Sequence, residues 1–301
     1  MHRIDIGIDA GGTTTRLAAR LSSGEVLKAE NHGSNPRVVG TAGTVGVLSK
    51  LIEEACEPYL AGADVRLCAG IAGASTSDVQ GEISGGLSIA LAVAAKKTIQ
   101  ITDDATTSFE AAFAGRPGTQ LLLGTGSNII CKTLDGRWVH SGGWGYLIGD
   151  EGSGYSIGRL GLRAVARAMD RGLSTRLAAR ATADFGLGSR SSFLSAVYGG
   201  SLLFADFARA VLDEASTGDI ECRLLVSEAV NDLVDDLAAT IEKVSSDLPR
   251  QIRVVGGLSR STVYMRELRD GIAVRLGEEW EIGPSERTPL EGALWMASRL
   301  E

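Results

Sequence analysis

The stretch IDIGIDAGGTTTRLAARL, residues 4–21, begins with a strand pattern, passes through a glycine turn and continues as a second strand. Apolar side chains dominate residues 4–9, and Gly11 and Gly12 follow them with three threonines. Bare glycine turns let backbone N–H groups approach an anion closely, and threonine hydroxyls add further donors. The stretch therefore predicts a β-hairpin that opens the fold and can hold a phosphate.

The same arrangement occurs a second time. The strand TQLLLG, residues 119–124, runs into the turn TGSN and the strand NIICKTL. A third strand follows each hairpin, at residues 25–31 and 137–143, and helix and strand patterns then alternate in both halves. Two α/β lobes with mixed sheets are the predicted fold, and the cleft between such lobes is the usual place for a ligand.

The expected elements follow from hydrophobic spacing. In the first half, we expect helices over residues 41–61, 77–95 and 106–115 and strands over 65–73 and 98–104. In the second half, we expect a helical stretch over 153–247, a strand over 252–259, a helix over 262–275 and a strand over 279–284. Thr288-Pro-Leu-Glu291 fits a capping box that starts the last helix. The predicted lobes are residues 1–117 and 118–287, with the helix 288–301 packing back on the first lobe.

The composition excludes several classes of protein. The 301 residues carry a net charge of −7 with scattered lysines and arginines, which excludes a nucleic-acid partner. No apolar run reaches the roughly 18 residues of a membrane span, and the N-terminus enters a strand pattern directly. Four cysteines without Cys-x-x-Cys spacing argue against a zinc or iron–sulfur site and for a reduced, cytoplasmic protein. With only three histidines, we expect carboxylates to carry any chemistry.

Two common nucleotide-binding motifs are absent from the sequence. The chain has no Gly-x-x-x-x-Gly-Lys-Ser/Thr loop, and no Gly-x-Gly-x-x-Gly follows a strand. A third glycine pair, Gly256-Gly257, leaves an apolar strand and enters a helix. Such a pair permits either the flat approach of an adenine ring or close packing of the strand on the helix, and the residues alone leave both readings open.

Two acidic positions are candidates for chemistry. Asp9 ends the first strand just before the glycine turn, where a carboxylate can hold Mg²⁺ beside phosphates or bond to its own turn. Asp103 and Asp104 are expected at the end of a strand, where α/β sheets bind ligands and where a base can accept a hydroxyl proton. Neighbouring strand residues point to opposite faces, so at most one of the two enters the cleft, and the spacing does not choose between them.

Five segments together resemble a known family: GIDAGGTTT, GSNP, ITDDA, LLLGTGSN and GGWGYLIGDEGSGYSIG. In this order and at these distances they resemble the N-acetylglucosamine kinase and glucosamine kinase branch of the BadF/BadG/BcrA/BcrD ATPase family. That family belongs to the sugar kinase–hsp70–actin superfamily. The resemblance covers essentially the whole chain and implies an α/β fold of two ribonuclease H-like lobes, the actin-like ATPase fold, with an interlobe cleft.

The resemblance also implies a reaction, in which MgATP phosphorylates the 6-hydroxyl of an amino sugar. Asp104 matches the catalytic base, and Asp9 is the predicted metal residue. The positions implied in nucleotide binding are Gly11, Gly12, Thr13, Thr14, Gly124, Thr125, Gly126, Ser127, Gly256 and Gly257. The positions implied in sugar binding are Asn35, Asp104, Thr125, Asn128, Gly143, Trp144, Gly145 and Asp150. The bare backbone at 142–158 would let a pyranose lie against the main chain.

Three functions remain open at this point. N-acetylglucosamine is the first expected substrate and free glucosamine is the second, because the pocket around the C2 substituent is not visible in the sequence. The third is an ATPase that activates a dehydratase or reductase, as in another branch of the family. Those relatives hold an iron–sulfur cluster with cysteines that this chain lacks in its glycine-rich region. The resemblance further implies a homodimer with no membrane partner.

Overall fold

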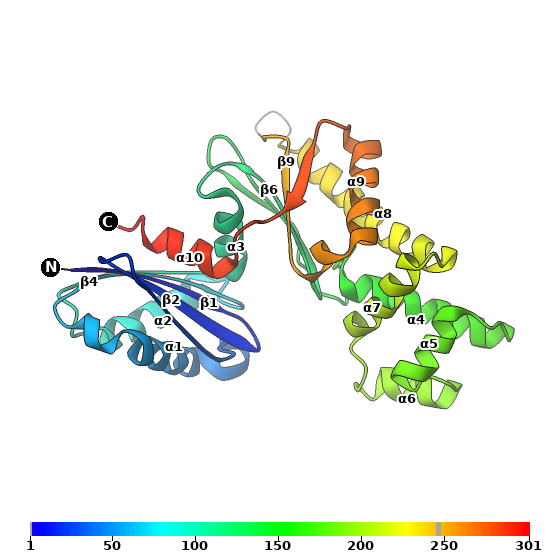
Figure 1. Cartoon of the computed structure of the whole chain (residues 1–301), viewed down its shortest axis with the longest axis horizontal. Coiled ribbons are helices and arrows are strands. Elements are labelled where there is room, and N and C mark those ends of the chain that lie inside the picture. The colour runs from blue at the N-terminus through cyan, green and yellow to red at the C-terminus, as the bar shows by residue number, and fades with distance from the viewer. Residues whose placement is uncertain (1, 245–247) are drawn as a thin grey trace. The chain divides into compact units, whose positions relative to one another are not determined.

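The computed structural model describes residues 2–244 and 248–301. The chain divides into two compact units, Met1–Arg116 with Ser285–Glu301, and Pro117–Pro284. Each unit has a five-stranded sheet and its own hydrophobic core (Figure 1). In both sheets the first three strands of the unit are antiparallel and the last two join in parallel. The predicted α/β class with two mixed sheets is confirmed.

The sheet of the first unit has the order β3-β2-β1-β4-β5. Its strands are β1 Arg3–Ala10, β2 Thr14–Leu21, β3 Val26–His32, β4 Asp64–Ile71 and β5 Lys96–Thr102. The helices α1 Pro36–Leu60 and α2 Ser77–Ala90 cover one face, and α3 Asp104–Phe113 and α10 Pro289–Ala297 cover the other (Figure 1). A Cβ on Gly7 would lie 2.3 Å from the backbone nitrogen of Leu294, so glycine at this position allows α10 to contact β1.

The sheet of the second unit has the order β10-β9-β6-β7-β8. Its strands are β6 Gly118–Leu123, β7 Ser127–Lys132, β8 Trp138–Gly142, β9 Gln251–Val255 and β10 Glu281–Pro284. Its helices are α4 Gly154–Arg171, α5 Arg176–Phe185, α6 Arg190–Tyr198, α7 Phe204–Ser216, α8 Ile220–Glu242 and α9 Thr262–Leu276, with the 3-10 turn η2 Gly257–Arg260. Helices α8 and α9 lie beside the sheet, and α5 and α6 lie farthest from it (Figure 1).

Several predicted boundaries are wrong. The helix expected over 41–61 begins at Pro36, because Asn35 caps it, and it kinks at Gly40. The helix expected over 77–95 ends at Ala90. The helical stretch expected over 153–247 consists of five separate helices, and its last three residues lie outside the described part of the chain. The capping box of Thr288 and Glu291 is present at the start of α10, as predicted.

Part of the glycine-rich segment is explained by helix packing. A Cβ on Gly158 of α4 would lie 1.8 Å from the carbonyl oxygen of Phe204, and a Cβ on Gly161 would lie 2.4 Å from a methyl group of Val211. These glycines therefore let α7 lie directly on α4. The close contact fixes the start of α4, which the candidate site uses.

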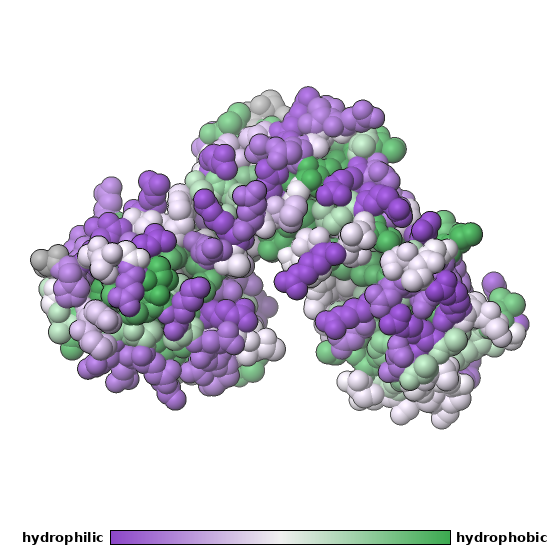
Figure 2. Space-filling model, in the orientation of Figure 1, coloured by the Kyte–Doolittle hydropathy of each residue, from purple (hydrophilic) through white to green (hydrophobic). Residues whose placement is uncertain are grey.

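The surface is mostly polar on the face drawn in Figure 2, where apolar residues form small separate patches. Over the described residues, no helix combines the length and the apolar character that crossing a bilayer requires.

Candidate functional site

The first glycine turn joins β1 to β2 and is open on its outer side. The N–H of Gly11 donates to the carbonyl oxygen of Thr14 at 2.9 Å, which closes the turn. Gly12 and Thr13 are exposed, and no atom lies within 4 Å of the position that a Cβ on Gly12 would take. Backbone and hydroxyl donors of this turn can therefore reach an anion.

A buried network holds the segment after β3 against this turn. The N–H of Ser34 donates to the carbonyl oxygen of Gly11 at 3.1 Å. The hydroxyl of Thr15 lies 2.8 Å from that of Ser34, and Thr44 donates to the carbonyl oxygen of Ser34 at 2.9 Å. A Cβ on Gly33 would lie 2.1 Å from the carbonyl oxygen of Gly12, so only glycine allows the segment to approach. The network thus holds the turn in place on its buried side and leaves Gly12 and Thr13 exposed.

Asn35, a predicted sugar-binding residue, follows that segment and has a structural role as well. Its Oδ1 accepts a hydrogen bond from the N–H of Arg37 at 2.9 Å and caps α1. It also packs on Gly73, where a Cβ would lie 2.5 Å from the same oxygen. The amide nitrogen is the atom of Asn35 that remains for a ligand.

The acids Asp9 and Asp104 of the first unit both have raised pKa values. Burial raises the pKa of Asp9, the charge of Asp104 raises it further, and Arg16 lowers it. Burial also raises the pKa of Asp104, as does the charge of Asp103, while backbone N–H bonds lower it. The side chain of Asp104 nevertheless reaches solvent. Two partly desolvated carboxylates near a glycine turn are suited to accepting a proton or attracting a cation.

The expectation that Asp103 and Asp104 end a strand is wrong. Strand β5 ends at Thr102, Asp103 is the N-cap of α3, and Asp104 is the first helical residue. The Oδ1 of Asp103 accepts from the N–H of Thr106 at 2.7 Å. The capping bond occupies Asp103 and leaves Asp104 as the acid that can act on a ligand, so the cap, and not strand alternation, distinguishes the two.

The carboxylate of Asp9 suits a Mg²⁺ ion that takes most of its ligands from water and from substrate phosphates. Within residues 2–244 and 248–301, no three His, Cys, Asp or Glu side chains form a group that could hold a metal. Mg²⁺ usually keeps several waters and is held by one or two carboxylates together with substrate phosphates. Asp9 and Asp104, next to a turn that can bind phosphate, match that kind of site.

The second glycine turn, between β6 and β7, lies at the start of α4. The N–H of Gly124 donates to the carbonyl oxygen of Gly126 at 2.9 Å. The first residues of α4 donate back to the turn: Gly154 to the carbonyl oxygen of Gly124 at 2.9 Å, and Tyr155 to that of Thr125 at 3.0 Å. The N-terminus of a helix carries a partial positive charge that favours anions. The corner between the turn and the helix start is therefore suited to an anion.

The third glycine pair has two different roles. Gly256 has φ of 108°, and a Cβ there would lie 2.3 Å from the carbonyl oxygen of Leu123, so this glycine permits close packing against β6. No atom lies within 4 Å of the corresponding position on Gly257, which lines a cavity. Close packing therefore holds for Gly256, whereas the approach of an adenine ring at Gly257 stays a prediction.

The cavity beside the second turn has a volume of about 500 Å³ and lies within the second unit. It is lined by Gly124, Thr125 and Gly154 on one side and by Ala205, Asp206, Ala208, Arg209, Leu212, Gly257, Leu258 and Arg260 on the others. Its size is within the range of small-molecule sites. Asp206, Arg209 and Arg260 were not predicted. Arg260 lies three residues after Gly257 and could have been suspected, whereas no sequence signal connects α7 to the turn.

Asn128, Gly143 and Asp150 lie together around Ser127. The N–H of Ser127 donates to Asp150 at 3.2 Å, and its carbonyl oxygen accepts from Gly143 at 3.1 Å. Asp150 is 7% exposed and has φ of 66°, a conformation that few residues other than glycine adopt. The Oδ1 of Asn128 is buried and has no hydrogen-bond partner in the described part of the chain. An unsatisfied buried acceptor of this kind is suited to a ligand's hydroxyl or N–H group.

Trp144 and Gly145 lie in the loop that follows β8. Trp144 is 75% exposed, and Tyr146, Leu147 and Ile148 after it are also exposed. Gly145 has φ of 85° and accepts from the N–H of Gly149 at 2.9 Å. Burial raises the pKa of Asp232 and of Asp236 on α8, and the charge of Glu151 raises both further, so Glu151 acts toward α8.

Comparison with known proteins places the chain in a family. Residues 6–297, nearly the whole chain, match the BadF/BadG/BcrA/BcrD ATPase family. The chain belongs to that family. Two relatives are each 28% identical to it over 268 residues: the N-acetylmuramic acid/N-acetylglucosamine kinase of Clostridium acetobutylicum and the N-acetyl-D-glucosamine kinase of Dictyostelium discoideum. The match to the Clostridium enzyme covers 86% of this chain and 87% of that enzyme. The match to the Dictyostelium enzyme covers 84% of this chain and 83% of that enzyme.

Solved structures show the same fold for this BadF/BadG-family chain. A provisionally named N-acetylglucosamine kinase from Chromobacterium violaceum is 26% identical, with a TM-score of 0.76 over 98% of this chain and 99% of that one. A ROK family glucokinase from Streptomyces griseus, in complex with glucose and AMPPNP, is 15% identical with a TM-score of 0.57 over 99% of each chain. The predicted actin-like ATPase fold is confirmed.

Proposed function

We propose that this chain is an ATP-dependent kinase that phosphorylates the 6-hydroxyl of an amino sugar, with N-acetylglucosamine as the first expected substrate. The observation that carries the proposal is the corner formed by the second glycine turn and the start of α4, which opens onto the 500 Å³ cavity. The names of the relatives from Clostridium and Dictyostelium support the same reaction class.

In this proposal, the nucleotide binds to the second unit. The base and ribose occupy the cavity, where Asp206, Arg209 and Arg260 supply polar contacts and Leu212 and Leu258 supply apolar ones. The phosphates bind to the N–H groups of Thr125 and Gly126, beside the start of α4, where the helix dipole stabilises their charge. The turn 11–14 of the first unit is the second predicted phosphate-binding turn.

Asp104 accepts the proton of the sugar 6-hydroxyl during transfer. Phosphoryl transfer depends mainly on positioning and charge stabilisation, and a raised pKa brings a carboxylate closer to the range in which a base is effective. Asp9 holds Mg²⁺, which neutralises charge on the phosphates when it is bound. The sugar ligands that we propose are the unsatisfied Oδ1 of Asn128 and the carboxylate of Asp150 in the second unit, and the amide nitrogen of Asn35 in the first.

An activator ATPase with an iron–sulfur cluster is the competing reading, and the cysteines disfavour it. Cys56, Cys68, Cys131 and Cys222 are all buried. They lie on different elements of two separate cores, so they do not supply a common surface ligand set.

The test is ADP release with Mg²⁺ and a panel of N-acetylglucosamine, glucosamine, N-acetylmuramic acid and glucose. The proposal expects the highest kcat/KM for N-acetylglucosamine and a loss of roughly 10⁴ for a sugar that lacks a hydroxyl the site pairs with. A preference for glucosamine would support the kinase assignment with glucosamine, and not N-acetylglucosamine, as the substrate. ADP release that does not depend on any sugar would contradict the kinase assignment.

A further inference from the structure

A second charged groove lies between α4 and α8, within the second unit and lined by residues other than those of the nucleotide cavity. Its volume is about 210 Å³. One wall carries Arg163, Arg167 and Arg171 of α4, and the other carries Glu221 and Glu228 of α8. Leucine and alanine side chains form the floor between them.

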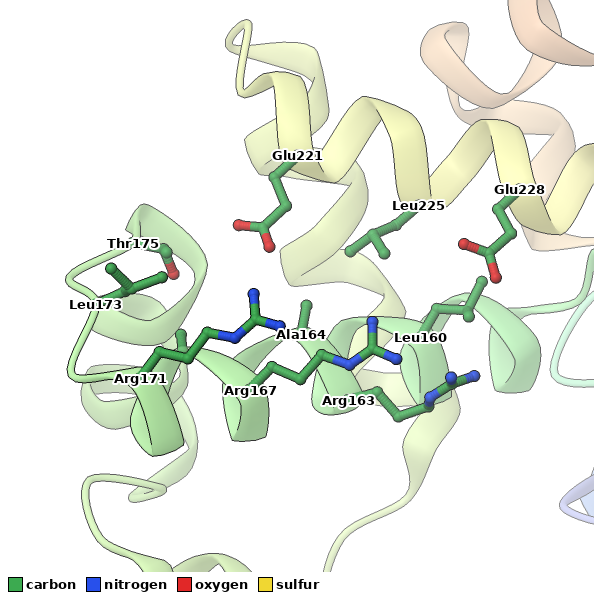
Figure 3. A pocket seen from close by; sticks show the side chains of 11 residues that line it. Leu160, Arg163, Ala164, Arg167, Arg171, Leu173, Thr175, Glu221, Leu225 and Glu228 are labelled. Carbon is green, nitrogen blue, oxygen red and sulfur yellow. The ribbon is translucent and has the colours of Figure 1, made fainter.

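The two walls face one another without pairing. Arg167 and Arg171 extend from α4 toward α8, and the carboxylates of Glu221 and Glu228 extend back toward α4 (Figure 3). In residues 2–244 and 248–301, none of the five charged side chains makes a hydrogen bond or an ion pair with protein. The arginines recur every four residues, so they lie on one face of α4 and repel one another. All five residues are exposed, so their charged groups are open to solvent and to a ligand.

Nearby arginines of the same unit are paired. Arg176 of α5 binds Glu214 at 2.7 Å, and Arg180 binds Asp184 and Asp213 at 2.8 and 2.9 Å. These two arginines thus have carboxylate partners. The arginines of the groove differ, because they have acids opposite them and yet remain available to a ligand.

The chemistry of the two walls defines the ligand. Guanidinium groups bind phosphate through pairs of parallel N–H donors, and several of them in a row suit a dianion. Carboxylates opposite them accept hydrogen bonds from an ammonium group and from hydroxyls. The lining carries one net positive charge, which matches a ligand with a phosphate dianion and one ammonium group. The volume is below the roughly 300–1,000 Å³ typical of larger ligand pockets, which favours a monosaccharide over a nucleotide.

We propose that the groove between α4 and α8 binds a phosphorylated amino sugar with a free amine, its phosphate on Arg163, Arg167 and Arg171 and its amine and hydroxyls on Glu221 and Glu228. The ligand would sit on α4, the helix whose first residues bond to the second glycine turn. This inference stands on the groove alone, and a binding measurement tests it without turnover.

The test is calorimetric titration of the full chain with glucosamine 6-phosphate, glucose 6-phosphate, N-acetylglucosamine 6-phosphate and inorganic phosphate. We expect glucosamine 6-phosphate to bind at least about tenfold more tightly than the other three, because only it offers both charges. Arg167→Gln should weaken this binding at least about tenfold. Glu228→Gln should remove the preference over glucose 6-phosphate. Arg159→Gln is the matched control, since Arg159 lies one turn earlier on α4 and does not line the groove.

Four results would overturn the proposal. The first is the absence of binding at millimolar concentration, and the second is equal weakening by Arg167→Gln and Arg159→Gln. The third is loss of binding in the presence of saturating N-acetylglucosamine, which would place the probe in the sugar site. Equal affinity for inorganic phosphate would reduce the groove to a simple anion site and would also contradict the proposed ligand. Binding that persists with N-acetylglucosamine present would support the groove whether or not the chain is a kinase.

Discussion

Asp104 and its neighbours determine how the proposed reaction depends on pH. The pKa of Asp104 is raised, first by burial and then by the charge of Asp103. The acid limb of kcat/KM reports the free enzyme's base. We therefore expect activity to fall, as the pH is lowered, at a higher pH than the ordinary aspartate value of 3.8 would give.

Asp103→Asn should move that limb to lower pH. The substitution removes the neighbouring negative charge, yet asparagine can still accept the N–H of Thr106 and cap α3. The measurement is the pH profile of kcat/KM, with Asp78→Asn in the first turn of α2 as the control that leaves the limb in place. A limb that stays in place or moves upward in Asp103→Asn would argue against Asp104 as the titrating base.

Asp9→Asn should stabilise the chain at neutral pH while reducing activity. The pKa of Asp9 is higher in the folded chain than the ordinary 3.8, because burial and Asp104 disfavour its charge. Folding is therefore penalised above the folded pKa, and the penalty disappears as the pH falls below 3.8. Thermal unfolding should show a higher Tm for Asp9→Asn at pH 7 and no gain near pH 3. A lower Tm at pH 7 would indicate that Asp9 stabilises the fold.

The substitution Gly158→Ala tests the packing of α4 on α7. A Cβ there would lie 1.8 Å from the carbonyl oxygen of Phe204, so Gly158→Ala must separate the two helices. We expect a loss of about 1–3 kcal/mol in unfolding free energy and weaker ATP binding, because α4 positions the second turn. Gly81→Ala in α2 is the control, since that position is open and alanine should stabilise the helix by about 0.5–1 kcal/mol. Equal stability of the two variants would contradict the packing.

The sequence predicts some elements well and others poorly, for identifiable reasons. The two strand–turn–strand hairpins are found because alternating apolar residues and glycine turns are local signals. The end of β5 is misplaced, because TDDATTS continues a strand pattern while its Asp103 also fits an N-cap, and only the bond to Thr106 decides between them. Asp206 and Arg209 are missed because α7 reaches the second turn through helix packing, which no local pattern records.

The residues proposed for nucleotide binding and those proposed for catalysis lie mainly in different units. The nucleotide cavity, the second turn and the start of α4 belong to Pro117–Pro284, whereas Asp9, Asp104 and the first turn belong to the other unit. Because Asp104 is outside the unit that holds the cavity, its substitution should affect transfer and not nucleotide affinity. The glycine turns could be predicted from sequence in both units, but the cavity could not.

Turnover and nucleotide binding of Asp104→Asn, measured side by side with the wild-type chain, test the role of this carboxylate. The assay follows formation of N-acetylglucosamine 6-phosphate and ADP and determines the Kd for ATP. The account predicts an unchanged fold, a Kd within about twofold of wild type and a kcat lower by about 10² or more. An Asp104→Asn chain that forms the product at the wild-type rate would contradict it.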